Sequence, residues 1–130
     1  MQVGMHNEQQ ATSPTMLELV LRLHGEFRKS LEPIRVTPLQ AGVMLYLHRH
    51  AGARQTDAAA ALLVRTPTMA EVVQDLVRKR WVTKRRSVQD RRAVHLRLSR
   101  RGEAMTRTIK HHMRHMEAHA KTLRQVRTSI

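Results

Sequence analysis

Residues 66–99 read TPTMAEVVQDLVRKRWVTKRRSVQDRRAVHLRLS, and the spacing of their apolar side chains changes partway along. In the first half these side chains recur every three or four residues, as on one face of a helix, at Met69, Val72, Val73, Leu76 and Val77. In the second half, Val94, Leu96 and Leu98 alternate with polar residues, which is typical of a strand. The stretch therefore predicts a helix and then a two-stranded hairpin that begins after Trp81.

Helical segments are also predicted upstream of this stretch. The first covers residues 13–32, with Ser13 as its N-cap and the following proline in its first turn. The second begins at Thr37, where Gln40 lies three residues further on and completes a capping box, and it ends at Gly52. Both helices are thus expected from local signals alone.

A short alanine-rich helix is predicted over residues 56–63, directly before the helix of the quoted stretch. Thr66 is expected to cap that later helix, with Pro67 in its first turn. Short helices followed at once by a hairpin are the order of a winged helix-turn-helix, in which the second helix of the pair enters the major groove of duplex DNA. We therefore expect a mainly α fold with a small β-hairpin.

A predicted helix lies on each side of this winged module. After Ser99, which can cap it, the last helix covers residues 100–130 and carries a narrow apolar stripe. Such a stripe is more often a packing seam than a cofactor site, and with the 13–32 helix it is expected to form a dimerisation region. The residues assigned to that region are Leu17, Leu21, Met105, Ile109, Met113, Met116 and Leu123. The rest of the predicted division is a flexible arm over residues 1–12 and a DNA-binding module over residues 36–99.

The charge of the chain indicates a polyanionic partner. Lys and Arg number 24 against 10 Asp and Glu, a formal net charge of +14. Between residues 78 and 101, eleven basic residues accompany a single acid, Asp90. The alternative is a solvated basic surface, although solubility is usually achieved with mixed signs. Because aromatic residues make up only 2% of the chain, modules that stack single-stranded bases on aromatic rings are disfavoured, and duplex DNA is the expected partner.

Several other classes of protein are disfavoured by what the sequence lacks. The chain has no Cys, which excludes disulfides and thiolate metal sites within it. Its longest apolar run, residues 58–64, is far too short to cross a bilayer, so we expect no membrane partner and a cytoplasmic location. The sequence also has no glycine-rich phosphate loop, nucleophile elbow or HExxH motif. We therefore expect neither catalysis nor a cofactor.

The turn of the hairpin carries an unusual density of positive charge. Residues 84–92, KRRSVQDRR, contain five basic residues around a single turn. An arginine at the tip can enter the minor groove, where a narrow groove strengthens the negative potential. We expect Asp90 to hold and orient Arg92, and Arg92 to insert. The alternative is an ordinary polar turn whose surface ion pair contributes little.

The remaining candidate contacts divide by their expected partner. Base contacts are expected from the polar side of the reading helix, at Thr66, Thr68, Glu71 and Gln74. Phosphate contacts are expected from Arg78, Lys84, Arg85 and Arg86. Asp90, Arg91 and Arg92 complete the predicted DNA-binding set at the wing.

Residues 36–102 resemble the MarR family of multiple antibiotic resistance regulators. The resemblance rests on VTPLQ at 36–40, RTPTM at 65–69, LVRKRWV at 76–82, DRRAVHLRLS at 90–99 and RG at 101–102. It implies a homodimer with one winged module per subunit, placed on a roughly palindromic operator. In the family, release is often by a small anionic or phenolic ligand. We expect repression by operator occlusion as the output.

Two positions depart from the family pattern. Arg80 stands where family members commonly have glycine, so the turn into the wing is made without glycine's conformational freedom. Glu71 stands where the family often has an arginine, and a carboxylate repels phosphate but can accept from a cytosine amino group. The operator sequence of a relative therefore does not transfer to this chain.

Histidines along the last helix suggest an alternative function. His111, His115 and His119 recur every four residues and could hold a transition metal in a metal-responsive regulator. However, a closed zinc site needs about four ligands, and no carboxylate or Cys on that face supplies the others, so no metal site is assigned. A second alternative is an interaction protein that keeps the winged fold but acts through its dimer surface.

Overall fold

The computed structural model describes the main chain of residues 14–128. Side chains are described up to Arg114, and again at Ala118. The predicted arm over residues 1–12 and the predicted cap Ser13 lie outside the described residues.

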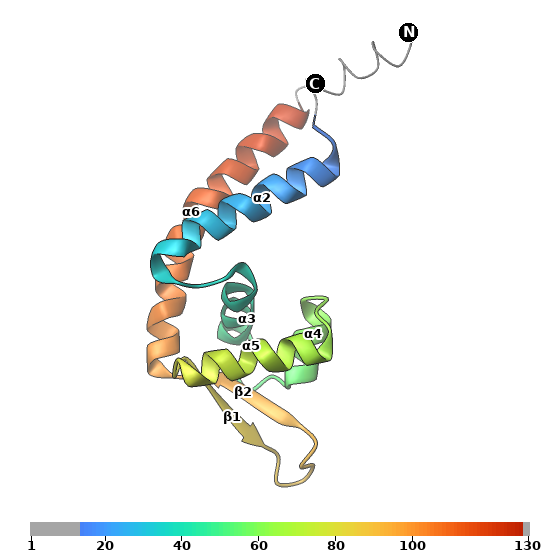
Figure 1. Ribbon diagram of the computed structural model, residues 1–130, viewed down its shortest axis with the longest axis vertical. Coiled ribbons are helices and arrows are strands. Elements are labelled where there is room, and N and C mark those ends of the chain that lie inside the picture. The colour runs from blue at the N-terminus through green and yellow to red at the C-terminus, as the bar shows by residue number, and fades with distance from the viewer. Residues whose placement is uncertain (1–13, 129–130) are drawn as a thin grey trace.

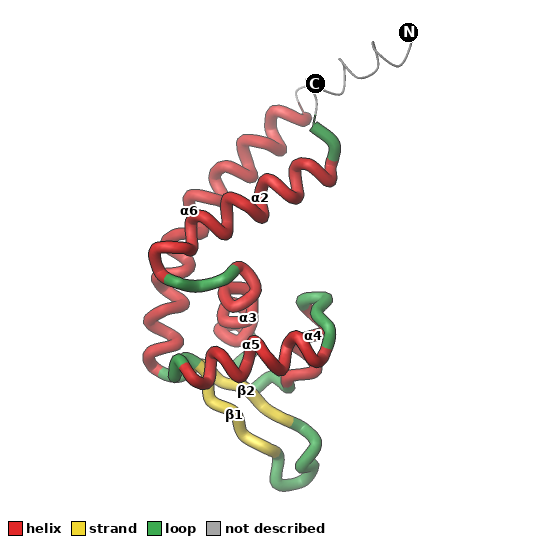
Figure 2. Tube along the Cα trace, in the orientation of Figure 1, coloured by secondary structure: helices red, strands yellow, loops and turns green. Residues whose placement is uncertain are grey.

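Five α-helices and a two-stranded hairpin make up the described part of the chain (Figure 1). In chain order the elements are α2 (Met16–Leu31), the 3-10 turn η1 (Glu32–Ile34), α3 (Pro38–Arg49), α4 (Gln55–Ala61), α5 (Thr66–Arg78), β1 (Val82–Arg86), β2 (Val94–Leu98) and α6 (Arg100–Thr128). Helices α2 and α6 lie side by side and extend away from the module that α3, α4, α5 and the hairpin form (Figure 2). The predicted mainly α, winged helix-turn-helix class is confirmed.

Helix α2 begins later than its sequence signals predict. Its N-cap is Thr15, whose hydroxyl accepts a hydrogen bond from the Glu18 amide at 3.2 Å. The Glu18 carboxylate in turn accepts from the Thr15 amide at 3.0 Å, which completes a capping box. Pro14 therefore precedes the helix, and the prediction that it lies in the first turn is wrong. The Thr15–Glu18 pair satisfies two free backbone donors, whereas a single serine cap satisfies one.

Helix α3 begins where the sequence predicts and ends earlier. Thr37 and Gln40 exchange the two hydrogen bonds of the predicted capping box, each at 3.1 Å. The helix ends at Arg49 and not at Gly52. Gly52 instead has a positive φ of 81° in the following loop, where its amide donates to the Leu96 carbonyl at 2.9 Å. This contact attaches the loop after α3 to the hairpin.

Helix α5 begins at Thr66. Thr66 was expected to be the N-cap, with the helix beginning at Pro67, so the helix begins one residue earlier than predicted. Its N-cap is Arg65, with no side-chain capping bond, and Pro67 lies in the first turn. The predicted core row is confirmed, because Met69, Val73 and Leu76 are all fully buried.

The core lies where α3, α5, the hairpin and α6 meet. Its largest side chains with less than 2% exposure include Met44, Leu47, Leu76, Leu96 and Ile109. Ile109 was expected at a subunit contact, and that assignment is wrong, because this side chain is 0% exposed within the core of a single chain. The spacing of apolar residues along a helix identifies its apolar face, but it does not identify the neighbour that covers that face.

Three helical segments end on a residue with left-handed backbone. Arg35, Leu63 and Arg80 have φ values of 56°, 54° and 62°. At each of them the amide, and the amide of the next residue, bond back to carbonyls of the preceding helical turn, as in a Schellman motif. This end normally carries glycine, because the conformation costs other residues roughly 1 kcal/mol. Arg80 thus makes the turn into the wing despite that cost.

The start of α6 is attached closely to the start of the hairpin. Ser99 caps α6 as predicted, accepting from the Gly102 amide at 3.0 Å, and its hydroxyl donates to the Arg80 carbonyl. The Ser99 amide also donates to the Trp81 carbonyl at 2.9 Å. Gly102 is needed here, since a Cβ at this position would lie 2.0 Å from the Trp81 carbonyl oxygen. The glycine three residues after Ser99 therefore has a packing reason.

None of the helices in the described residues combines the length and the apolar character that a membrane span requires.

Candidate nucleic-acid interface

One side of α5 is free for contacts outside the chain. The predicted base-contacting residues Thr66, Thr68, Glu71 and Gln74 are all exposed, and so is Arg78 at the end of the helix. They lie opposite the buried row because a helix of 3.6 residues per turn separates the two sets. The structure thus brings the predicted reading residues together on one helix face.

Arg78 has an intramolecular partner that the sequence analysis did not identify. Its guanidinium forms an ion pair with Asp75, three residues earlier on α5. The side chains are 70% and 46% exposed, so the pair contributes little to stability. The pair instead restrains the Arg78 side chain. A phosphate that contacts Arg78 would share its guanidinium group with Asp75.

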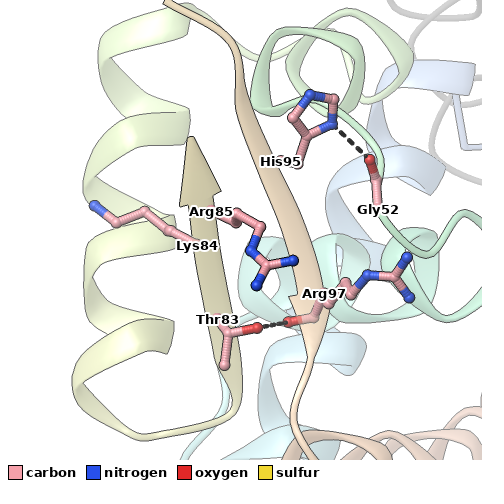
Figure 3. Close-up of a pocket in the computed structure, with 6 residues that line it drawn as sticks. All are labelled: Gly52, Thr83, Lys84, Arg85, His95 and Arg97. Carbon is pink, nitrogen blue, oxygen red and sulfur yellow. Dashed lines mark hydrogen bonds between the residues drawn. The ribbon is translucent and has the colours of Figure 1, made fainter. Parts of the chain in front are cut away.

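The hairpin distributes its basic residues over two faces. Strands β1 and β2 are antiparallel, with Thr83 opposite Arg97 and Arg85 opposite His95. Because side chains alternate along a strand, Lys84 lies on the face of the buried Leu96, and Arg85 on the other face. Figure 3 shows Lys84 and Arg85 pointing to opposite sides of β1. The side chains of the predicted phosphate contacts Lys84 and Arg85 therefore leave β1 on opposite faces, although both residues line one pocket of the hairpin.

The outer face of the hairpin holds cationic residues that sequence reasoning missed. Arg85 lies with Arg97 and His95 around a pocket of about 430 Å³, closed on one side by Gly52 from the loop after α3 (Figure 3). His95 is fixed there by a 3.0 Å hydrogen bond between its Nδ1 and the Gly52 carbonyl, which requires a donating N–H at Nδ1. Strand alternation could have grouped Arg85 with Arg97, but the Gly52 contact spans 43 residues and leaves no sequence signal.

The wing loop is ordered by hydrogen bonds to its main chain. The Asp90 carboxylate accepts from the Arg92 amide at 3.0 Å, and the Ser87 hydroxyl accepts from the amides of Gln89 and Asp90. Asp90 thus orients Arg92 through the backbone, and the expectation that the carboxylate holds the guanidinium is corrected.

The three arginines of this loop differ in their availability. Arg86 donates from its guanidinium to the Arg91 carbonyl at 2.8 Å, so this predicted phosphate contact also braces the loop. Arg91 and Arg92 are exposed, and among the described residues their guanidinium groups have no ion-pair partner. The wing therefore presents two unpaired guanidinium groups on a loop with a defined main chain.

The candidate metal ligands fall at the edge of what the structure describes. His111 and His112 have their rings in contact, and His112 Nδ1 lies 2.9 Å from the Thr108 carbonyl. The side chains of His115 and His119 lie outside the described residues. Over the described part of the chain, no group of three or more potential ligands lies close enough to hold a metal ion.

The remaining dimerisation candidates differ in exposure. Leu17 and Leu21 on α2 are 66% and 62% exposed, and Met16 and Val20 beside them extend this apolar face. Met105 and Met113 on α6 are instead partly buried against the core of their own chain. Two further candidates, Met116 and Leu123, have side chains outside the described residues.

A known family model matches the module built above. The model for the MarR family aligns with residues 36–93, which run from the start of α3 to the end of the wing loop. Residues 36–93 are therefore similar to the MarR family over most of the winged module. Members of the MarR family are transcription regulators and not enzymes, and this agrees with the prediction that the chain has no catalytic role. No curated protein sequence is detectably similar to the chain.

Solved structures of MarR-like proteins share the fold over most of the chain. The MepR–DNA complex from S. aureus aligns with a TM-score of 0.76 at 23% identity, covering 81% of this chain and 78% of that one. Wild-type MarR from E. coli, in its apo form, gives 0.73 at 17% identity, over 88% and 95%. PcaV from Streptomyces coelicolor, in complex with its natural ligand, gives 0.71 at 24% identity, over 92% and 93%. At these identities the likeness establishes the fold.

The two departures from the MarR pattern, Arg80 and Glu71, lie in different surroundings. Arg80 occupies a left-handed helix end, which explains why glycine is common in the MarR family at this place. Glu71 is exposed in the middle of the reading face, where a carboxylate can accept hydrogen bonds but cannot bind phosphate.

Proposed function

We propose that this chain is a sequence-specific duplex-DNA-binding transcription regulator that acts as a homodimer and represses transcription from a palindromic operator. The observation that carries this proposal is the exposed polar face of α5, which lies in one module with a wing of unpaired arginines. A MarR-like fold is compatible with DNA binding, because the structural relative MepR has been solved in complex with DNA.

In the proposed complex, α5 enters the major groove. Thr66, Thr68, Glu71 and Gln74 read base edges, since hydroxyls, an amide and a carboxylate together offer both donors and acceptors. Glu71 would accept from the amino group of cytosine, the only base whose major-groove edge offers a donor without an adjacent acceptor of its own.

The positively charged residues hold the phosphate backbone and the minor groove. Arg78, Lys84, Arg85 and Arg86 contact phosphates, and each such contact adds salt-sensitive affinity without sequence preference. Arg92, with Arg91 beside it, enters the minor groove, and Asp90 sets the backbone that aims it. We propose that the wing and α5 act together, because α5 and β1 are in direct contact.

A second copy of the chain is proposed to cover the apolar face of α2. Met16, Leu17, Val20 and Leu21 are each more than half exposed, a larger apolar surface than isolated exposed residues would give. Two copies related by a two-fold axis would place two reading helices on two half-sites, which accounts for a palindromic operator.

We also propose that a small ligand releases the complex. Between α2, α3 and α6 lies a pocket of about 430 Å³ whose lining combines apolar Phe27, Leu45 and Met113 with the cations Lys110 and Arg114. An apolar floor with positive charges at its edge favours a small organic anion. PcaV, a structural relative, has been solved with its natural ligand.

The experiment that tests the proposed function is a fluorescence-anisotropy titration across a salt series. Wild type and Arg92→Ala are compared on the DNA upstream of the chain's own gene and on a scrambled duplex. We expect tight, salt-sensitive and sequence-dependent binding that Arg92→Ala weakens. Equal and weak binding to both duplexes would contradict the proposal and favour an interaction protein that uses only its dimer surface.

A further inference from the structure

The corner where α5 ends and α6 begins contains a separate pocket of about 400 Å³, which is also lined by residues at the end of η1 and just before β1. In Figure 1 this corner lies at the left, where α5 ends and α6 begins. Ile34 and Trp81 supply its apolar lining, and no carboxylate lines it. Its other lining residues are all cationic, namely Arg35, Arg78, Lys79, Arg80 and Arg101.

Two of these five cations are engaged within the chain. Arg78 pairs with Asp75. Lys79 Nζ lies 3.1 Å from the Arg35 carbonyl, to which it donates, and 4.8 Å from the centre of the Trp81 ring. Lys79 thus fixes the ring that forms one wall of the pocket.

The other three cations, Arg35, Arg80 and Arg101, are exposed, and within the described residues no hydrogen bond or ion pair engages their guanidinium groups. Three unpaired guanidinium groups around one pocket repel each other, so an anion bound among them would relieve that repulsion.

The backbone conformation at two of these arginines also indicates a ligand site. Arg35 and Arg80 both occupy left-handed helix ends, with φ values of 56° and 62°. Glycine would make the same turns without strain, so the stability of the fold does not account for arginine at either position. Residues held in costly conformations cluster at ligand sites, and two of the three left-handed residues, Arg35 and Arg80, line this pocket, whereas Leu63 lies outside it.

We propose that this corner pocket binds a small multivalent oxyanion of the phosphate or polyphosphate class. A single negative charge would leave the three guanidinium groups largely uncompensated. A phosphate group accepts bidentate hydrogen bonds from a planar guanidinium group. A carboxylate can do the same, but its two oxygens are then used by one arginine, whereas phosphate has further oxygens for the others. The site goes beyond the proposed function, because it needs neither DNA nor a second copy of the chain.

Trp81 makes the proposal directly measurable, because it is the only tryptophan in the chain and it lines the pocket. The DNA-free protein is titrated with tripolyphosphate at constant ionic strength while Trp81 fluorescence is followed, and the affinity is confirmed by calorimetry. We expect a saturable change in wild type. Arg35→Gly and Arg80→Gly should each weaken the affinity about tenfold, the loss of one charge-assisted hydrogen bond, and each should raise the melting temperature.

Two control variants show what relief of strain alone and loss of charge alone do to the affinity for tripolyphosphate. Leu63→Gly relieves the same left-handed strain outside the pocket, and Arg107→Gln removes an exposed charge elsewhere on α6. Both should keep the affinity of wild type for tripolyphosphate. A rise in stability together with a loss of anion binding is a result that a purely structural role for Arg35 or Arg80 would not give.

Two outcomes would overturn the proposal. The first is the absence of a saturable change in wild type. If Arg35→Gly and Arg80→Gly then weaken duplex binding, these charges contact the DNA backbone, and the proposed function stands. The second outcome is an equal loss of affinity in Arg107→Gln, which would indicate unspecific attraction to the net charge.

Discussion

Gly102→Ala should destabilise the chain although it adds only one methyl group to a helix. The added Cβ would lie 2.0 Å from the Trp81 carbonyl oxygen and 2.9 Å from the Trp81 carbonyl carbon, both of them main-chain atoms. To reach ordinary contact, the start of α6 and the start of the hairpin must separate by about 1.4 Å, and a gap of about 1 Å already costs packed atoms much of their contact energy.

That separation weakens the two bonds that join the segments, from the Ser99 amide to the Trp81 carbonyl and from the Ser99 hydroxyl to the Arg80 carbonyl. It also disturbs the N-cap bond within α6, from the Gly102 amide to the Ser99 hydroxyl. Losing an N-cap and two hydrogen bonds at about 1 kcal/mol each gives a destabilisation of about 3 kcal/mol. For a chain of this size that is a fall in melting temperature of roughly 10 °C.

The assay is urea denaturation followed by circular dichroism, and Gly25→Ala is the matched control. Gly25 also lies inside a helix, but a Cβ there would meet nothing within 4 Å, so the same substitution should stabilise by roughly 0.5 to 1 kcal/mol. Opposite signs at the two glycines are the expected result. If Gly102→Ala matched wild type within about 0.5 kcal/mol, a scale typical of surface changes, the close approach of α6 to Trp81 would be refuted.

Substitutions at Leu63, at Asp90 and at the apolar face of α2 test three other features of the chain. Leu63→Gly, at a left-handed position where the side chain is 93% exposed, should raise the free energy of unfolding by roughly 0.5 to 1 kcal/mol, measured in urea. Asp90→Asn keeps an oxygen acceptor for the Arg92 amide and should retain DNA affinity in an anisotropy titration, whereas Asp90→Ala should lower it; equal loss in both would mean that the carboxylate charge, and not the backbone contact, matters. Leu17→Glu combined with Leu21→Glu should shift the mass measured by analytical ultracentrifugation from dimer to monomer without lowering helicity, and an unchanged dimer would place the subunit contact elsewhere.

The order of the elements could be predicted because periodicity is a local property. The switch from a helical to an alternating pattern after Trp81 located α5 and the hairpin correctly, and the capping box at Thr37 and Gln40 located the start of α3. The start of α2 was misplaced because Ser13 and Thr15 are both good caps, and only the bond to Glu18 decides between them.

The arrangement of the candidate site was only partly predictable. The exposed face of α5 follows from its buried face, so the reading residues were identified together. By contrast, Arg97 and His95 join Arg85 through a loop contact distant in sequence, and the corner pocket combines residues from η1 to α6. Ile109 shows the same limit, since apolar periodicity alone does not distinguish a core neighbour from a second subunit.

Helix α6 is held at one end, where its first turn packs against the base of the wing. Its 29 residues form one continuous helix about 43 Å long, and its first turn is held by Ser99 and Gly102 against the base of the wing. A tilt of only about 5° at that fixed end would move the far end by about 4 Å, given 1.5 Å of length per residue. A small change in the tilt of α6 at the base of the wing therefore becomes a displacement of several ångströms at the far end of the helix.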